Sequence, residues 1–478
     1  MDFLTYLQEQ LHARVFAASY EKTAKGEACM IRKDETTLLA VNGELGKLFH
    51  GTASGEVVLC PTDHANRMVL NELFAYTKPT AFGQKTPTFG FGDRLGYANP
   101  AQVRAIEKTQ IRPVLAQQSL RELTLTGRTN VEVIDVAAWA VFREGYKLGF
   151  ASDGDHLKTM EEIASALQDG CTMITLDCSL VLNQTSVNGK ALAASFKALP
   201  AQQQAAFTER YLRSDEPAKF GLAFTEDSVF ELYRIYAGAL ALIHDVYFEL
   251  LTKAGRAVDF EVSLDETVET TSPEAHYFVA REMMEMGVVA TSVAPKFVGE
   301  FQKAIDYIGD LEELKTTLAV HAKIADRFGY KLSLHSASEK YSVLPLIAEA
   351  TNGRFHIKTS GTSWLEVVET ISKHAPALYR KMHEVALETI DEARKFYVVH
   401  CDTSKVRPLN ETTDAQLPEY LELGNNDARQ LMHITYGFIL ERPELKKQIL
   451  CFLNDHFDLY EKEAEELYDR HLTLLQHA

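Results

Sequence analysis

Two carboxylates and an imidazole lie close together in the stretch GFASDGDHLKT, residues 149–159. Asp153, Asp155 and His156 follow an apolar approach and precede a helix whose start the sequence predicts at Thr159. An ionised carboxylate can take a proton from a substrate hydroxyl, and a neutral imidazole can bind a divalent metal ion. The stretch therefore has the residue types of a general base beside a metal ligand. A hydrogen-bonded polar loop is the alternative interpretation.

A second histidine, His335 in LSLHS, also follows a predicted strand. Two imidazoles completed by oxygen ligands suit Zn²⁺, Mn²⁺, Co²⁺ or Ni²⁺. The sequence contains no linear metal motif such as HExxH. Two explanations therefore stay open for His156 and His335: a shared divalent-metal site, or two separate loop histidines that are hydrogen-bonded.

The stretch DFEVSLDET, residues 259–267, adds further carboxylates. Strand alternation puts Glu261 and Asp265 on one face and Glu266 on the other. Charged side chains are rarely buried without a partner. Glu261 is therefore either an interior acid beside a metal or a lysine, or one member of a structural ion pair.

A lysine, two hydroxyls and a glycine open the stretch KTSGTSWLEVV, residues 358–368. The helix predicted after Lys358, with Ser363 and Glu366 as a capping box, points its first amides at the same place. Such donors can hold an anion, either a phosphate or a substrate carboxylate. An ordinary capped helix start is the competing interpretation.

The elements that must position these residues alternate along the chain from about residue 86. Runs of β-branched or aromatic residues are separated by longer helical patterns, which is typical of βα units on a parallel sheet. Eight such runs predict an α/β fold, a (β/α)8 TIM-type barrel, rather than an open doubly wound sheet. The runs are 88–93, 146–153, 172–177, 259–266, 288–295, 331–336, 354–360 and 396–402.

Active sites of such barrels lie at the C-terminal ends of the strands, where the βα loops converge. Residues able to do chemistry gather near all eight predicted exits. They are Asp93, Arg94, Asp153, Asp155, His156, Asp177, Glu261, Asp265, Glu266, Lys296, His335, Lys358, Thr359, Ser360, His400 and Asp402.

Signals for helix ends agree with the predicted alternation of strands and helices. Ser272 can cap a helix that Pro273 opens and Gly287 ends, and Thr159 with Glu162 forms a second capping box.

The segments outside the barrel carry no low-complexity linker. We predict an N-terminal extension over residues 1–85, packed on a barrel that spans residues 86–439. An insertion over 178–250 follows the third predicted strand, and amphipathic helices occupy residues 440–478.

Composition narrows the class of protein. With 478 residues, 46% of them hydrophobic, the chain can bury a large core. A formal net charge of −18 repels nucleic acids and anionic membranes, so neither is an expected partner. The N-terminus lacks the apolar stretch of a signal peptide, and no segment approaches about 18 apolar residues, so we expect a cytoplasmic protein. Six cysteines without a CxxC pair argue against a cysteine-based zinc site.

Six motifs, taken together and in order, resemble the tagaturonate/fructuronate epimerases, which are metal-dependent enzymes of bacterial hexuronate catabolism. The resemblance runs from about residue 85 to the end of the chain. The motifs are GFGDRLG, FASDGDHLKT, FEVSLDET, APKFVGEFQKAIDYIGD, LSLHSASEKYS and FHIKTSGTSWLEVV.

The resemblance implies roles for particular residues. It makes Asp155 the proton acceptor and places the proton donor in FEVSLDET, at Glu261 or at Glu266. It implies that His156, Gln302 and His335 bind a divalent cation, which is Zn, Mn, Co or Ni. The lysines available for a substrate carboxylate are Lys296, Lys340 and Lys358.

The implied reaction interconverts D-tagaturonate and D-fructuronate, with neutral ketohexoses as a side activity. The inverted carbon is β to the ketone, so enolisation does not acidify its C–H bond. Retro-aldol cleavage, rotation of the aldehyde and re-addition is the expected route. A metal-dependent sugar aldolase or isomerase on the same barrel is one alternative, and a non-catalytic sugar-binding protein is another. The sequence does not indicate an oligomeric state.

Overall fold

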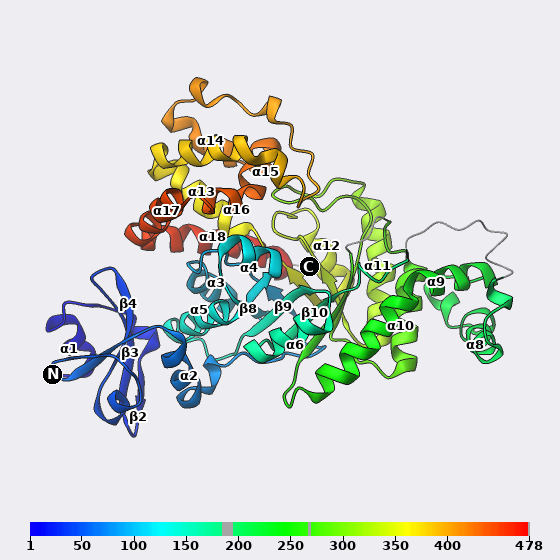
Figure 1. Cartoon of the computed structure of the whole chain (residues 1–478), viewed down its shortest axis with the longest axis horizontal. Helices are drawn as coiled ribbons and strands as arrows, with labels where there is room; N and C mark the ends of the chain where they lie inside the picture. The colour runs from blue at the N-terminus through cyan, green and yellow to red at the C-terminus, as the bar shows by residue number, and fades with distance from the viewer. Residues whose placement is uncertain (184–194, 266–268, 477–478) are drawn as a thin grey trace.

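A closed barrel of eight parallel strands lies at the centre of the protein (Figure 1). The structure is a computed structural model that describes residues 1–183, 195–265 and 269–476, so Glu266 lies outside the described residues. The predicted (β/α)8 fold is therefore confirmed. In chain order the barrel strands are β7 (Thr88–Gly90), β8 (Arg112–Ser119), β9 (Ala151–Leu157), β10 (Met173–Asp177), β11 (Asp259–Leu264), β12 (Ser292–Pro295), β13 (Lys331–Leu334) and β14 (Phe355–Lys358).

One of the eight predicted strands was wrong, and one barrel strand was missed. Residues 396–402 form no strand, and Val398 within them is 87% exposed. The missing strand is β8, whose sequence RPVLAQQS contains a proline and two glutamines and therefore does not read as a central strand. Pro113 is registered with Phe89 of β7, and the side-chain amides of Gln117 and Gln118 donate to the main-chain carbonyls of Thr359 and Asp93. The predicted insertion does follow β10, which is the fourth barrel strand rather than the third.

Helices follow the strands and cover the outside of the barrel (Figure 1). The predicted caps at Ser272 and Thr159 are present: Ser272 accepts from the amide of Ala275, and Thr159 forms a capping box with Glu162. The helices of this layer are α3 (Asn99–Glu107), α4 (Leu120–Thr126), α5 (Asn130–Arg143), α6 (Met160–Asp169), α8 (Ala201–Phe207), α9 (Glu226–Asp245), α10 (Pro273–Met286), α11 (Leu311–Phe328), α12 (Leu344–Thr351) and α13 (Thr362–His374).

The capping box predicted at Ser363 and Glu366 is not formed. Helix α13 begins two positions earlier, with Gly361 as its N-cap and no side-chain cap. Ser363 lies inside the helix and donates its hydroxyl proton to the carbonyl of Gly92, which ties α13 to the exit of β7. Glu366 is buried on the side of α13 that faces the C-terminal helix.

The N-terminal residues form an antiparallel sheet of their own at one end of the molecule (Figure 1). One face of this sheet packs on α1 (Phe3–Glu9), and the other packs on Trp139 and Phe142 of α5, so α5 joins the sheet to the barrel. The strands are β1 (Arg14–Val15), β2 (Glu21–Thr23), β3 (Gly26–Lys33), β4 (Thr36–Val41), β5 (Thr52–Ser54) and β6 (Val57–Pro61), followed by α2 (His64–Leu73).

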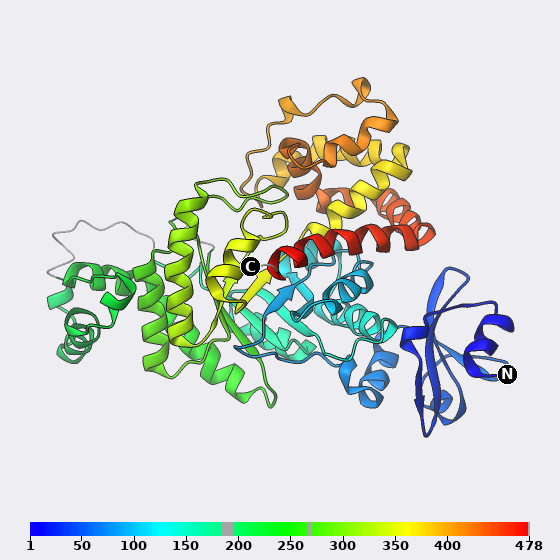
Figure 2. The ribbon, with the colours of Figure 1, turned by 180° about the vertical axis from the view of Figure 1, so that it is seen from behind.

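The C-terminal helices cover the barrel from the other side. The last of them packs along α3, α12 and α13 and crosses the back of the molecule in red (Figure 2). Its inner residues, among them Tyr460, Tyr468 and Leu472, belong to the main hydrophobic core. These helices are α14 (Pro376–Ala393), α15 (Asn426–Ile434), α16 (Tyr436–Leu440), α17 (Pro443–Asp455) and α18 (Phe457–Gln476).

One helical segment, Glu226–Lys253, is long and apolar enough by composition to meet the usual test for a membrane span, with a mean hydropathy of 1.3. Core helices of soluble proteins pass the same test, so a single such helix is weak evidence. Its residues Val229, Tyr236 and Ile243 are buried in the main core, and α9 packs on α10.

The burial of Glu366 generates a prediction about stability. Burial, and then the neighbouring carboxylates of Glu369 and Glu463, raise the pKa of Glu366 to about 8. Between pH 4.5 and pH 8 the folded protein therefore holds a proton that the unfolded chain releases, so this group makes stability fall as the pH rises through that window. Replacing Glu366 with Gln should raise the unfolding free energy at pH 9 by a few kcal/mol, since each unit of pKa shift is worth about 1.4 kcal/mol.

Urea unfolding at pH 5 and at pH 9 measures this difference. The exposed Glu388 on α14 provides the matched control, because Glu388→Gln should leave the pH dependence of stability as it is in the unmodified protein. An equal change of stability at both pH values in Glu366→Gln would contradict the assignment.

Candidate functional site

A bulge in β9 brings Asp155 and His156 to the same mouth of the barrel. The pairing with β10 slips between two registered pairs, Gly154 opposite Ile174 and Leu157 opposite Leu176, so β9 carries one extra residue there. His156 takes up the extra length with a positive φ of 56°, which is uncommon for a residue other than glycine. Simple alternation would turn His156 away from Asp155. The bulge instead places its ring 4.9 Å from that of His335, centroid to centroid.

Lys358 at the end of β14 occupies the centre of the barrel interior. Its ammonium lies 2.8 Å from the carboxylate of Asp153 and 3.4 Å from that of Glu261, and it forms a short ion pair with Asp155. It also donates to the hydroxyl of Thr175 at 2.7 Å. Although burial alone would lower the pKa of Lys358, these carboxylates raise it, so the side chain is a permanent cation.

Glu261 points into the barrel and holds His335 in place. Its Oε1 lies 2.7 Å from Nε2 of His335, and its Oε2 accepts a hydrogen bond from Ser292 at 2.6 Å. Both interpretations left open by the sequence describe part of this arrangement, because Glu261 is an interior acid and is also ion-paired with Lys358. The other ring nitrogen of His335, Nδ1, lies 2.9 Å from Asp265 Oδ2.

Two histidines and one aspartate form a group that could hold a metal ion. The possible ligand atoms of His156, Asp265 and His335 all lie within 4.8 Å of one another. Nδ1 of each histidine is buried and faces a carboxylate, Asp265 at 2.9 Å for His335 and Asp177 at 3.6 Å for His156. Two nitrogens and one carboxylate oxygen suit Zn²⁺, Mn²⁺, Co²⁺ or Ni²⁺. The Glu261–His335 contact is the carboxylate–histidine arrangement that commonly supports a metal-binding imidazole. These residues therefore fit a divalent cation.

The charges around this group favour a cation between them. Burial alone would lower the pKa of His335, but Asp265 and Glu261 raise it to about 10. Burial alone would raise the pKa of Asp177, but His156 and Ser179 lower it to about 2. Without a metal the imidazole of His335 therefore carries a proton that balances these carboxylates, and a divalent cation would replace that proton.

Asp155 is buried, in contact with Lys358 and 3.8 Å from His156 Nε2. Burial raises the pKa of Asp155, but Lys358 and His156 together lower it below its ordinary value. The side chain is therefore an ionised carboxylate at neutral pH, in the protonation state that a general base requires.

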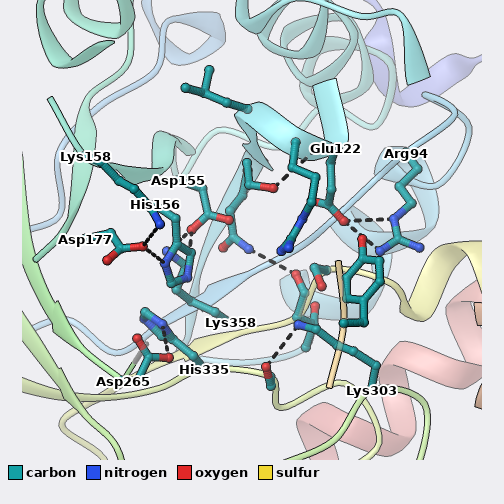
Figure 3. Close-up of a pocket in the computed structure, with 18 of the residues that line it drawn as sticks. Arg94, Glu122, Asp155, His156, Lys158, Asp177, Asp265, Lys303, His335 and Lys358 are labelled. Atoms are coloured by element: carbon teal, nitrogen blue, oxygen red, sulfur yellow. Dashed lines mark hydrogen bonds and ion pairs between the residues drawn. The ribbon is translucent and has the colours of Figure 1, made fainter. Parts of the chain in front are cut away.

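A cavity of about 260 Å³ opens above these side chains (Figure 3). It is lined by Asp155, His156, Asp265, His335 and Lys358, which come from three different strand exits and the end of β14. A wider cavity of about 560 Å³ adjoins it, sharing Asp265, His335 and Lys303.

The structure separates the remaining predicted residues. Gln302 lines the wider cavity, but its Oε1 accepts from the amide of His400 and from Gln430 Nε2, each at 2.9 Å. Lys296 lines the same wider cavity. Lys340 is fully buried and donates to the carbonyls of Gln302 and Ile305, so it anchors a loop.

Sequence reasoning missed Asp265 as a member of the metal group. The signal was present, since Asp265 shares the face of β11 on which Glu261 lies. Asp153 was noted at a strand exit but received no role, and it turns out to be a partner of Lys358.

Comparisons with known proteins place the chain in a family. A family model described as tagaturonate epimerase (UxaE) matches residues 16–475. A tagaturonate/fructuronate epimerase from Thermotoga maritima is 37% identical over 472 residues, which cover 97% of each chain.

Crystal structures of a relative agree with this result. The native fructuronate-tagaturonate epimerase UxaE from Cohnella laeviribosi is 40% identical, with a TM-score of 0.94 over 99% of this chain and 98% of that one. The same relative in complex with two glycerol molecules matches with a TM-score of 0.94 and 40% identity over 100% of both chains. By its sequence over nearly the full length, and by its fold, this chain belongs to the tagaturonate epimerase family.

Proposed function

We propose that the protein interconverts D-tagaturonate and D-fructuronate by inverting the hydroxyl-bearing carbon β to the ketone. The chain is a member of the family, and one observation in its structure supports this proposal. The ionised carboxylate of Asp155 and a group that could bind a metal lie side by side in one cavity. The relatives from Thermotoga maritima and Cohnella laeviribosi bear the name of this activity.

His156, His335 and Asp265 would hold the divalent cation. Gln302, the further ligand expected from the family resemblance, would have to give up hydrogen bonds that its Oε1 accepts from His400 and Gln430. When bound, the cation supplies Lewis-acid polarisation of the substrate ketone. Glu261 fixes the ring of His335, and Lys358 in turn holds Glu261, so these two residues position the metal group from below.

Asp155 acts as the base on the hydroxyl of the inverted carbon. It takes the hydroxyl proton, and the bond from that carbon to the carbon α to the ketone breaks. The bonding electron pair remains on the ketone half as an enediolate, and the inverted carbon becomes an aldehyde. After the aldehyde turns, the enediolate carbon attacks its opposite face, the bond forms again, and the new alkoxide takes a proton.

Two glutamates, Glu261 and Glu266, are the candidates for the proton donor. Of the two glutamates considered, Glu261 is engaged with His335, Ser292 and Lys358 beneath the cavity. Glu266 lies outside the described residues, and it directly follows Asp265, which lines the cavity.

The cytoplasm is the proposed location, and a small ketohexuronate is the proposed partner. All six cysteines are free thiols, and only Cys451 is exposed, which fits a reducing compartment.

The first prediction concerns the metal. His335→Ala and Asp265→Asn should each weaken Co²⁺ or Mn²⁺ binding tenfold or more, because each removes a ligand, and chelation should abolish turnover. Titration calorimetry and the visible absorption of bound Co²⁺ measure binding independently of activity. His244→Ala, on the exposed side of α9, is the matched control. Unchanged Co²⁺ binding in both variants would refute the metal assignment.

The second prediction tests the reaction and its route together. The protein with added divalent metal, incubated with D-tagaturonate in D₂O, should form D-fructuronate that carries no deuterium at the inverted carbon, because cleavage of the C–C bond leaves that hydrogen in place. Product NMR measures both the conversion and the label. Stoichiometric deuterium there would show direct deprotonation, and net release of the two fragments would show an aldolase.

Asp155→Asn should lower turnover about a hundredfold or more, the usual effect of losing a general base, while Co²⁺ remains bound. A rate equal to that of the unmodified protein would remove Asp155 from the mechanism.

The third prediction follows from the place of Lys358 in the barrel. Lys358→Met should lower the unfolding free energy by about 3–5 kcal/mol, because it leaves Asp153, Asp155 and Glu261 buried without their counter-ion. Lys253→Met, which removes an exposed ion pair with Glu249, should change stability much less. Guanidinium unfolding of the two variants measures the contrast. A stable Lys358→Met protein with only a raised KM for uronates would instead make Lys358 a substrate-binding residue.

A further inference from the structure

Arg94 is a cation of the cavity to which the proposed chemistry gives no role. It follows β7 in the motif GFGDRLG and lines the same cavity as Asp155 and His335. The loop that carries it is held by Asp93, whose carboxylate accepts hydrogen bonds from the amides of Gly96 and Ala98 at 2.8 Å each. The backbone beneath Arg94 is therefore fixed.

The guanidinium of Arg94 is held on two sides. Its Nε and Nη2 lie 2.9 and 2.7 Å from Oε1 of Glu122 in α4. Its plane lies over the ring of Tyr436 in α16, with 3.7 Å from the guanidinium carbon to the ring centroid. Glu122 occupies one edge of the guanidinium and Tyr436 covers a face, so the group cannot turn without losing both contacts.

One corner of this guanidinium has no partner. Nη1 is buried and makes no hydrogen bond to any described residue, and Arg94 as a whole is 1% exposed. The second oxygen of Glu122, Oε2, is likewise buried without a partner among the described residues. Buried charged groups with unused hydrogen-bonding capacity are costly, and both of these residues line the cavity. Arg94 and Glu122 therefore each have one hydrogen-bonding atom left for a polar ligand.

The cavity has two chemically different ends. In Figure 3 the metal group and its carboxylates lie on one side, and Arg94, Glu122 and Lys303 lie on the other. Lys303 follows β12 and donates to the hydroxyl of Ser336 at 3.0 Å. A ligand that spans the cavity therefore meets the metal group at one end and Arg94 with Lys303 at the other.

We propose that Arg94, assisted by Lys303, binds the carboxylate of the uronate substrate, and that Glu122 Oε2 accepts a hydrogen bond from the hydroxyl beside that carboxylate. This assignment rests on the proposed function and makes it specific. It replaces the lysines expected from the sequence, since Lys358 is held by three carboxylates and Lys340 by main-chain carbonyls.

The assignment also explains how the cavity retains a cleaved substrate. In the retro-aldol route the aldehyde fragment carries the carboxylate. If Arg94 holds that carboxylate, the aldehyde can turn about the adjacent bond while the fragment stays in place for re-addition.

The test compares a uronate with a neutral sugar of the same carbon skeleton. Arg94→Gln combined with Glu122→Gln removes both members of the ion pair, so no buried charge is left alone. KM for D-tagaturonate should rise about tenfold to a hundredfold, as expected when a charge-assisted hydrogen bond is lost. KM for D-tagatose, or its inhibition constant where turnover is too slow to follow, should rise much less, because this sugar has no carboxylate to lose and shares only the hydroxyl that faces Glu122.

Two single variants test the proposed carboxylate site if the double variant folds poorly. Lys303→Met is a change at a half-buried side chain, and Arg94→Lys keeps the charge beside Glu122 but removes Nη1. Both should raise KM for the uronate selectively. The matched control is Arg67→Gln with Asp135→Asn, which removes a buried ion pair between α2 and α5 outside the cavity and should leave both constants unchanged.

The outcomes separate this proposal from the proposed function. Equal effects of the variants on both sugars, or none on the uronate, would overturn the carboxylate site while tagaturonate turnover stands. An unmodified, metal-loaded protein that does not convert D-tagaturonate would overturn the proposed function itself.

Discussion

The ammonium of Lys358 in the barrel interior is the interaction on which the site depends. Three carboxylates from β9 and β11 face the barrel axis, and in a buried place they would repel one another and lose their hydration. Lys358 supplies the charge that allows them to stay ionised close together. It forms an ion pair with Asp155, the proposed base, and it contacts Glu261, which in turn holds the imidazole of His335. One network of ion pairs and hydrogen bonds thus holds both the base and the metal group.

The barrel turns this network toward a single opening. Parallel strands end at the same mouth, so residues that are far apart in the chain meet there. The bulge in β9 adds a second adjacent residue to that mouth and accounts for the DGDH stretch, in which a base and a metal-binding histidine are neighbours. Across the cavity, the Arg94–Glu122 pair is held by a different pair of strand exits and by the C-terminal helices through Tyr436. The two ends of the cavity are therefore positioned independently of each other.

Much of the fold could be predicted because hydrophobic periodicity and helix caps are local signals. Seven of the eight predicted runs overlap barrel strands, and the caps at Ser272 and Thr159 form as expected. The failure at β8 has a physical reason: this barrel strand carries Pro113 and two buried glutamines whose side-chain amides are satisfied by main-chain carbonyls of other segments, and these partners cannot be seen in the sequence. Residues 396–402 have the composition of a strand but lie exposed at the rim.

The sequence by itself determined most of the strands, the crowding of Asp155 and His156, and the placement of Glu261 and Asp265 near the same strand end, because these follow from spacing within one element. Only the tertiary structure decided which charges meet. Lys358 looks in sequence like an anion-binding lysine, yet three carboxylates from other strands already surround it. In sequence Arg94 is one more residue at a strand exit. In the structure Glu122 and Tyr436 hold it, and its Nη1 has no partner among the described residues. The energy of a charged side chain depends on neighbours that come from distant segments, and spacing along the chain does not encode them.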